Sequence, residues 1–300
     1  MKLGCMVHLE GRLAQVSLEE QFARLKEFGI PTCQLNCWKP ELFTDEKAEE
    51  IKTLSAKYGI EISALWCGWS GPCTWNFYDG QTSLGLVPVA YRYQRMQELM
   101  KGALFAEKIG VTDVITHCGY LPENPVSAEY AEIITALKSV VKFYREHGRW
   151  FLFETGQETP VTLLRVITDL GIENLGVNLD PANLVMVAGD RPENALKYLG
   201  KYVVHTHAKD GIMLKKRVEA AVAIGEEAKE HKAMLEMGRK YLELPLGDGD
   251  VDFDIYLPAL AATGFNGFLT IEREVGDQPE KDIAMAVQFL REKIAKYNLK

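Results

Sequence analysis

The fold of this 300-residue chain is decided by four segments: LFETG (152–156), VNLDPAN (177–183), VVHTHAKD (203–210) and FLTIERE (268–274). Each begins with apolar, strand-forming residues and ends in polar ones. Glu154 and Asp180 are 26 residues apart, and Asp180 and His207 are 27 apart. Such an interval accommodates one strand, one helix and their connections. The spacing therefore predicts a run of βα units, each ending its strand in a polar side chain.

Four further strand-like segments precede these: LGCMVHL (3–9), TCQLNCW (32–38), EISALWCGW (61–69) and DVITHCGY (113–120). Stretches with helical spacing lie between them, and Ser17 and Thr44 are the expected N-caps of the first two, with Gly29 and Gly59 ending them. Eight alternating strands and helices predict an α/β fold, a (β/α)8 TIM barrel formed by residues 1–300 as one domain. A doubly wound sheet would give a similar alternation. The barrel is favoured because nearly every strand ends in a polar or reactive residue, and a barrel collects all its strand ends at one mouth.

Two segments are longer than a βα unit requires. Residues 70–89 contain Gly, Pro and aromatic residues without periodicity and are interpreted as a loop over the barrel mouth. Residues 213–243 are highly charged with roughly helical spacing, which predicts a helical insertion between the seventh and eighth strands. Either segment would shape the pocket or a dimer contact, so a homo-oligomer is left open.

Composition argues against several classes of function. The 42 acidic and 34 basic residues give a net charge of -8, which disfavours a nucleic-acid partner. The N-terminal residues do not resemble a signal peptide, and no apolar stretch is long enough to cross a membrane. Six cysteines, all within the first 118 residues, form no CxxC pair. We therefore expect a cytoplasmic protein with reduced thiols and no membrane partner.

The ends of the fifth to eighth strands each offer one metal ligand: Glu154, Asp180, His207 and Glu272. Three carboxylates and one imidazole form an oxygen-rich site for one divalent cation, with Mn2+ favoured and Mg2+, Co2+ or Zn2+ as alternatives. A single carboxylate at a strand end is more often a helix cap or a surface ion pair, as expected for Asp210. Four ligands in register are harder to explain in that way.

Strand alternation places two more polar residues below these ligands. His205 lies one layer beneath His207, and Asn178 beneath Asp180, so both are expected to orient the ligands. Strands five and eight are three apart in a ring of eight. Glu154 and Glu272 would then approach a substrate from different sides, as a base and an acid must.

These segments, together with PLGDGDVDF (245–253), resemble the xylose isomerase-like TIM barrel superfamily, in particular its sugar phosphate isomerase/epimerase group. That group includes ketose 3-epimerases and inosose dehydratases. The resemblance implies that Glu154, Asp180, His207 and Glu272 hold one divalent cation and that the two glutamates are the catalytic acid/base pair. Many members have His where this chain has Asn183, whose amide can bond a hydroxyl but cannot transfer a proton. The DNA-repair endonucleases of the superfamily need further ligands that this chain lacks.

Substrate contacts are predicted for His117, Trp66, Lys209 and Asn183. The alternatives are that His117 supports a ligand, that Trp66 only packs, and that Lys209 is a solvated charge. The predicted activity is isomerisation or epimerisation of a ketose or sugar phosphate, by proton abstraction next to a metal-bound carbonyl. A metal-dependent hydro-lyase and a non-catalytic sugar-binding barrel are the two alternatives.

Overall fold

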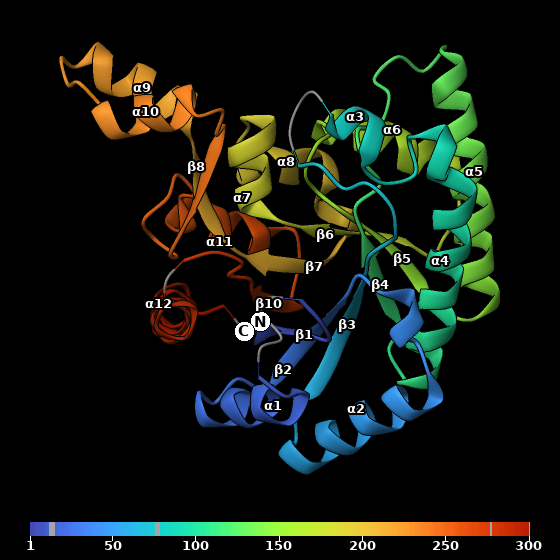
Figure 1. Ribbon diagram of the computed structural model, residues 1–300. Helices are drawn as coiled ribbons and strands as arrows, with labels where there is room; N and C mark the ends of the chain where they lie inside the picture. The colour runs from blue at the N-terminus through green and yellow to red at the C-terminus, as the bar shows by residue number, and fades with distance from the viewer. Residues whose placement is uncertain (12–15, 76–78, 277, 300) are drawn as a thin grey trace.

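The computed structural model, which describes residues 1–11, 16–75, 79–276 and 278–299, contains a closed barrel of eight parallel strands (Figure 1). The order around the barrel is β1-β10-β7-β6-β5-β4-β3-β2, with β2 paired to β1. The predicted (β/α)8 fold is confirmed. The strands are β1 (Lys2–His8), β2 (Thr32–Cys37), β3 (Glu61–Cys67), β4 (Asp113–Thr116), β5 (Trp150–Glu154), β6 (Leu175–Leu179), β7 (Val203–Ala208) and β10 (Phe268–Ile271).

One long helix follows each barrel strand and packs on the outside of the barrel (Figure 1). These helices are α1 (Leu18–Glu27), α2 (Asp45–Tyr58), α4 (Val89–Lys108), α5 (Ala128–Glu146), α6 (Pro160–Leu170), α8 (Pro192–Leu199), α11 (Phe253–Ala262) and α12 (Pro279–Tyr297). Shorter turns are η2 (Pro40–Leu42), α3 (Gly80–Ser83), α7 (Pro181–Asn183), η3 (Leu184–Ala188) and η4 (Gly200–Tyr202).

The expected helix boundaries are present. Ser17 forms a capping box with Glu20, and Thr44 accepts a hydrogen bond from the backbone N–H of Lys47. Gly59 ends α2 with a φ of 66°, a left-handed conformation that residues with a side chain rarely adopt. These local signals set the length of each βα unit and so bring each strand end to the same mouth.

The interior of the barrel holds both apolar and polar side chains. Met6, Ala64, Trp66, Ile115 and Leu152 form a small buried cluster inside it. The remaining apolar core lies between the strands and the surrounding helices. Polar residues of β2, β6 and β7, namely Gln34, Asn178, His205 and His207, are also fully buried, so each needs hydrogen-bond partners inside the barrel.

The insertion between β7 and β10 is only partly helical. It contains α9 (Leu214–Ala223) and α10 (Lys229–Glu236), as predicted, but an antiparallel ribbon of β8 (Asp210–Met213) and β9 (Tyr241–Leu244) connects them to the barrel. In Figure 1 the two helices project away from the barrel at the tip of this ribbon. The ribbon was missed because its strands are only four residues long and lie within a charged segment.

Asp210 is not a helix cap, contrary to expectation. It begins β8, and its carboxylate accepts hydrogen bonds from the backbone N–H groups of Gly211, Gly247, Gly249 and Val251 at 2.8 to 3.1 Å. The error arose because the ribbon, and not a helix, follows this residue. Asp210 therefore fastens the loop over residues 245–251 to the base of the insertion.

The substitution Asp210→Asn is expected to lower the free energy of unfolding by about 2 kcal/mol, because an amide replaces one acceptor oxygen with a donor and leaves buried backbone N–H groups unpaired. Urea unfolding of this variant against wild type measures the effect. Asp248→Asn, in the same loop and exposed, is the control and should unfold with wild type. Equal midpoints for all three proteins would show that Asp210 does not hold the loop.

The segment over residues 70–89 is a loop with one short helix, α3, where it is described; residues 76–78 lie outside the described residues. The buried guanidinium of Arg95, on α4, donates hydrogen bonds to the carbonyl oxygens of Ser70, Pro72, Ser83 and Gly85 at 2.7 to 2.9 Å. These bonds hold the loop against the barrel. In the described part of the chain, no helix is long and apolar enough to cross a membrane.

Candidate metal centre and substrate pocket

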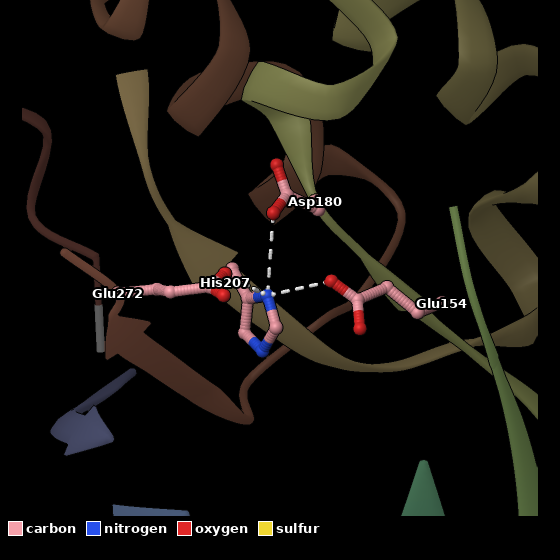
Figure 2. A group of neighbouring side chains, drawn as sticks. All are labelled: Glu154, Asp180, His207 and Glu272. Atoms are coloured by element: carbon pink, nitrogen blue, oxygen red, sulfur yellow. Dashed lines mark hydrogen bonds and ion pairs between the residues drawn. The ribbon is translucent and has the colours of Figure 1, made fainter. Parts of the chain in front are cut away.

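Four side chains from neighbouring strands converge at the carboxyl end of the barrel (Figure 2). Glu154 ends β5, Asp180 follows β6, His207 is on β7 and Glu272 follows β10. One ligand atom from each lies within 4.8 Å of the other three, and all four residues are buried. The structure thus brings together the four residues that the sequence selected.

The imidazole of His207 is the centre of this cluster. Its Nδ1 lies 3.2 Å from Oε1 of Glu154, 3.3 Å from Oδ2 of Asp180 and 2.7 Å from Oε2 of Glu272. Figure 2 shows the two glutamates on opposite sides of His207, with Asp180 above it. The other ring nitrogen, Nε2, lies 2.8 Å from the amide oxygen of Gln34. With Nε2–H donating to Gln34, Nδ1 is the ring nitrogen that faces the three carboxylates.

The two carboxylate oxygens of Asp180 have different partners. Oδ1 accepts the backbone N–H of Asn183 at 2.8 Å, which begins the short helix α7, and Oδ2 faces His207. The hydroxyl of Thr155 accepts the N–H of Asp180 and donates to its carbonyl. These bonds connect the ends of β5 and β6 and so set the distance between Glu154 and Asp180.

Glu154 is held by donors on both oxygens. The indole N–H of Trp66 donates to Oε2, and Nε2 of His117 lies 3.6 Å from the same oxygen. The amide of Asn183 donates to Oε1 at 3.4 Å. Burial alone would raise the pKa of Glu154, but His117 and His207 outweigh burial and lower it below its usual value.

Glu272 is paired with Lys209 on its other side. Nζ of Lys209 lies 3.3 Å from Oε1 of Glu272 and 2.9 Å from Glu274, and Glu243 is 3.9 Å away. Burial would lower the pKa of Lys209, yet the surrounding carboxylates, Glu272 first, hold it well above the usual range. Burial would likewise raise the pKa of Glu272, but Lys209 and His207 lower it. Lys209 is therefore a buried counter-charge, and not a solvated one.

The residues of this cluster fit a divalent cation. Burial would lower the pKa of His207, but Glu272 and Glu154 hold it well above the usual value, because the negative charge of the carboxylates converges on this ring. Oε2 of Glu272 is buried and faces this cluster, with Nδ1 of His207 2.7 Å away. One imidazole nitrogen and three carboxylate oxygens are a donor set suited to Mn2+, Mg2+, Co2+ or Zn2+.

The two residues expected beneath the ligands are both buried in the barrel. The amide of Asn178 lies 3.2 Å from Nε2 of His207 and 3.0 Å from Nδ1 of His205. Among the described residues, the hydrogen-bond partners of His205 are neutral groups, and its Nε2 lies 2.9 Å from the hydroxyl of Ser63. Burial lowers the pKa of His205 to about 3, so this ring is neutral. Asn178 thus contacts a ligand directly, whereas His205 acts one residue further away.

A cavity of about 170 Å3 opens above the cluster. All four predicted substrate residues line it: His117, Trp66, Lys209 and Asn183. The indole N–H of Trp66 donates a hydrogen bond to Glu154, and its ring packs on Trp38 with a centroid distance of 4.6 Å. Trp66 therefore forms part of the cavity wall and also positions Glu154. His8 also ends a strand, but it lines a different cavity, between the barrel and helices α1 and α12.

Several pocket residues were not identified from the sequence. Gln34 does not line the cavity, but it accepts a hydrogen bond from His207; it is one of three polar residues in its strand, with Thr32 and Asn36, so the sequence alone did not single it out. Glu243 and Tyr241 line the cavity from the inserted ribbon, and Trp75 from the 70–89 loop. No sequence pattern indicates these three residues, because the conformations of the ribbon and of the 70–89 loop bring them to the cavity.

Glu158 lies buried near the site, and burial raises its pKa to about 8, partly offset by backbone N–H groups of residues 156–158. Because the folded pKa is above the unfolded value, the folded state binds more protons between about pH 4.5 and 8. The free energy of unfolding should therefore fall by up to ~1.4 kcal/mol per pH unit as pH rises through this window. Glu158→Gln should remove this slope and be more stable than wild type at pH 8. Urea unfolding at several pH values from 5 to 8 measures this, and an equal change in the free energy of unfolding with pH for the two proteins would contradict the assignment.

Comparison with known proteins agrees with the barrel fold. A family model described as xylose isomerase-like TIM barrel matches residues 22–293. An uncharacterized protein of Methanocaldococcus jannaschii is 24% identical over 173 residues, which is 54% of this chain and 50% of that protein. The chain thus spans about half the length of the curated relative it matches.

Solved structures give the same result. A xylose isomerase domain protein from Planctomyces limnophilus has a TM-score of 0.82 and 27% identity, covering 99% of this chain and 97% of that one. A D-tagatose 3-epimerase-like protein has a TM-score of 0.71 and 18% identity, with 99% and 98% covered. The probable 3-DHS dehydratase of Bacillus anthracis has a TM-score of 0.68 and 16% identity, with 97% and 99% covered. At these low identities the last two show a shared fold.

Proposed function

This chain belongs to the xylose isomerase-like TIM barrel family, and we propose that it is a divalent-metal-dependent isomerase or epimerase of a ketose or sugar phosphate. The observation that carries the proposal is the buried cluster of Glu154, Asp180, His207 and Glu272 at the base of a small cavity. The epimerase-like neighbour of the same fold supports it. Mn2+ is the proposed metal, because three of the four donors are carboxylate oxygens.

The arrangement suits proton transfer at a carbon next to a carbonyl. A cation held by these four residues supplies a Lewis acid that polarises the carbonyl. Glu154 and Glu272 lie on opposite sides of His207, so one can take a proton from one face of the carbon while the other returns it on the opposite face (Figure 2). Nε2 of His117, 3.6 Å from Oε2 of Glu154, and Nζ of Lys209, 3.3 Å from Oε1 of Glu272, stabilise the ionised forms of these carboxylates.

Asn183 takes a positioning role in this account. Its amide holds Oε1 of Glu154 and the carbonyl of Thr155, so its remaining capacity toward a substrate is hydrogen bonding, without proton transfer. Two glutamates are therefore the acid and the base, and Asn183 does not replace either.

A hydro-lyase is the second candidate, supported by the dehydratase of the same fold. In that reaction the first glutamate again removes the proton, but the opposite acid protonates a departing hydroxyl. Both reactions begin in the same way, so the same residues are required. A barrel that only binds sugar would require neither glutamate.

The test is proton NMR in D2O with Mn2+-supplied protein and a panel of free ketoses, ketose phosphates and inososes. Solvent deuterium at a single carbon of one substrate would support proton abstraction. A product of unchanged mass, apart from deuterium, identifies an isomerase or epimerase, whereas loss of water identifies a hydro-lyase. Sugar binding without exchange on any compound would reject both enzymes in favour of the binding barrel.

A further inference from the structure

A second cavity, of about 740 Å3, lies directly beside the substrate pocket. Its walls are Trp75, residues 238–243 at the end of the inserted ribbon, and residues 273–276 after β10. The two cavities share Trp75, Tyr241, Glu243 and Glu274. We call the space above the metal ligands the inner chamber and the larger cavity the outer chamber; the two adjoin at Tyr241 and Glu243.

The two chambers differ in size in a way that bears on the substrate. Pockets for ligands of drug size are typically about 300–1,000 Å3. The inner chamber, at about 170 Å3, is below this range and suits one small ring, whereas the outer chamber falls within it. A substrate that used only the inner chamber would leave the larger one without a role.

The outer walls have the composition of a sugar subsite. Trp75 and Tyr241 provide aromatic faces for the C–H side of a ring, and Arg239, Lys240 and Glu274 provide donors and acceptors for hydroxyl groups. The ring of Trp75 lies 4.9 Å from that of His117, so the aromatic wall is continuous from the inner chamber outward. Charges of both signs line the outer chamber, which favours a neutral, polyhydroxylated group over a strongly charged one.

The ribbon that forms this wall is fixed in place. Oε1 of Glu243 accepts from Nη1 of Arg273 at 2.7 Å and from the backbone N–H of Glu274 at 3.1 Å. Arg273 also donates to Asp282 on α12 at 2.8 Å. Both Glu243 and Arg273 are largely buried, with side chains 6% and 9% exposed. The insertion is thereby attached to the strand end that carries Glu272.

We propose that the outer chamber is a second sugar subsite, and that the substrate is a ketose bearing a glycosyl substituent. The reacting ketose lies in the inner chamber, and the glycosyl ring lies between Trp75 and the ribbon. This inference rests on the proposed function for the inner chamber. It adds a substrate class and gives the inserted ribbon the role of a specificity-determining wall.

The experiment compares D-fructose with three glucosyl-fructoses that keep a free keto group: turanose, leucrose and isomaltulose. Deuterium incorporation gives kcat/KM for the Mn2+-supplied protein, and tryptophan fluorescence gives Kd independently of turnover. Val275→Trp fills the outer chamber, and Met285→Trp on α12 is the control, since the two residues are 41% and 50% exposed. Thermal unfolding of both variants verifies that they are folded.

We expect at least one disaccharide to exceed D-fructose in kcat/KM by about tenfold, the effect of a modest set of added contacts. Val275→Trp should remove this advantage while changing kcat/KM for D-fructose by less than about twofold. Met285→Trp should leave kcat/KM unchanged for D-fructose and for the disaccharides. A preference for D-fructose over all three disaccharides in both assays would overturn the subsite. An equal loss of kcat/KM for D-fructose and for the disaccharides in Val275→Trp would overturn it as well.

The two proposals fail in different ways. Exchange into D-fructose alone would leave the proposed reaction in place and reject the subsite. Tighter binding of a disaccharide that Val275→Trp abolishes, without exchange into any compound, would support the subsite and reject the reaction.

Discussion

Glu154→Gln is expected to lower kcat by roughly 1,000-fold, within the range found for removal of a general acid or base. Gln has nearly the same shape and can still accept the indole N–H of Trp66, so the pocket should be retained. It cannot take up a proton, and it weakens the negative charge that faces His207. Steady-state kinetics and deuterium exchange on whichever compound of the panel reacts measure the effect.

The matched control is Glu219→Gln on α9, an exposed glutamate whose partner is Lys215. It changes the same functional group far from the pocket and should keep wild-type kinetics. If Glu154→Gln retained activity within a few-fold of the control, Glu154 would be neither acid nor base, and the acid/base pair would have to be sought elsewhere in the pocket.

His207→Gln is expected to abolish stabilisation by Mn2+. A ligand that binds only the folded state stabilises it by about 2.7 kcal/mol at 100 times its Kd, so the Tm of wild type should rise with added Mn2+. Removal of the imidazole leaves three carboxylates without their only nitrogen donor. We expect the affinity for Mn2+ to fall by at least ~100-fold, more than for loss of a residue that only orients a ligand. A thermal-unfolding titration with Mn2+ measures both proteins.

His147→Gln controls for the loss of a histidine. His147 ends α5, and its ring is paired with Glu107 at the surface, 3.0 Å away. This variant should respond to Mn2+ as wild type does. An equal Mn2+-dependent rise in Tm for His207→Gln would place the metal at another site.

The sequence predicted the barrel and the ligand set because both depend on local regularities. Recurrence of Glu154, Asp180 and His207 at one βα interval follows from the unit length, which helix ends such as Gly171 of α6 define. A closed ring of eight strands then places the fifth and the eighth strand on opposite sides of His207. The roles of these residues in metal binding and catalysis stay predictions, as do the single-domain boundaries and the oligomeric state.

The surroundings of the ligands were not predictable in the same way. Burial lowers the pKa of Lys209, and Glu272, Glu274, Asp180 and Glu243 more than offset this; Glu243 reaches Lys209 only through the inserted ribbon. Trp66 could be placed at a strand end, but its hydrogen bond to Glu154 joins β3 to β5, which are not neighbours in the barrel. Asp210 was misassigned for the related reason that its four partners lie in the chain on both sides of the insertion.

The central claim is that Glu154, Asp180, His207 and Glu272 together hold one divalent cation. Elemental analysis of the purified wild-type chain, supplied with Mn2+ and then dialysed, tests this most directly, with Asp180→Asn measured in parallel. The account predicts one divalent cation per wild-type chain and a clear loss in the variant. A wild-type chain that retains no divalent metal, or a variant that retains as much as wild type, would contradict it.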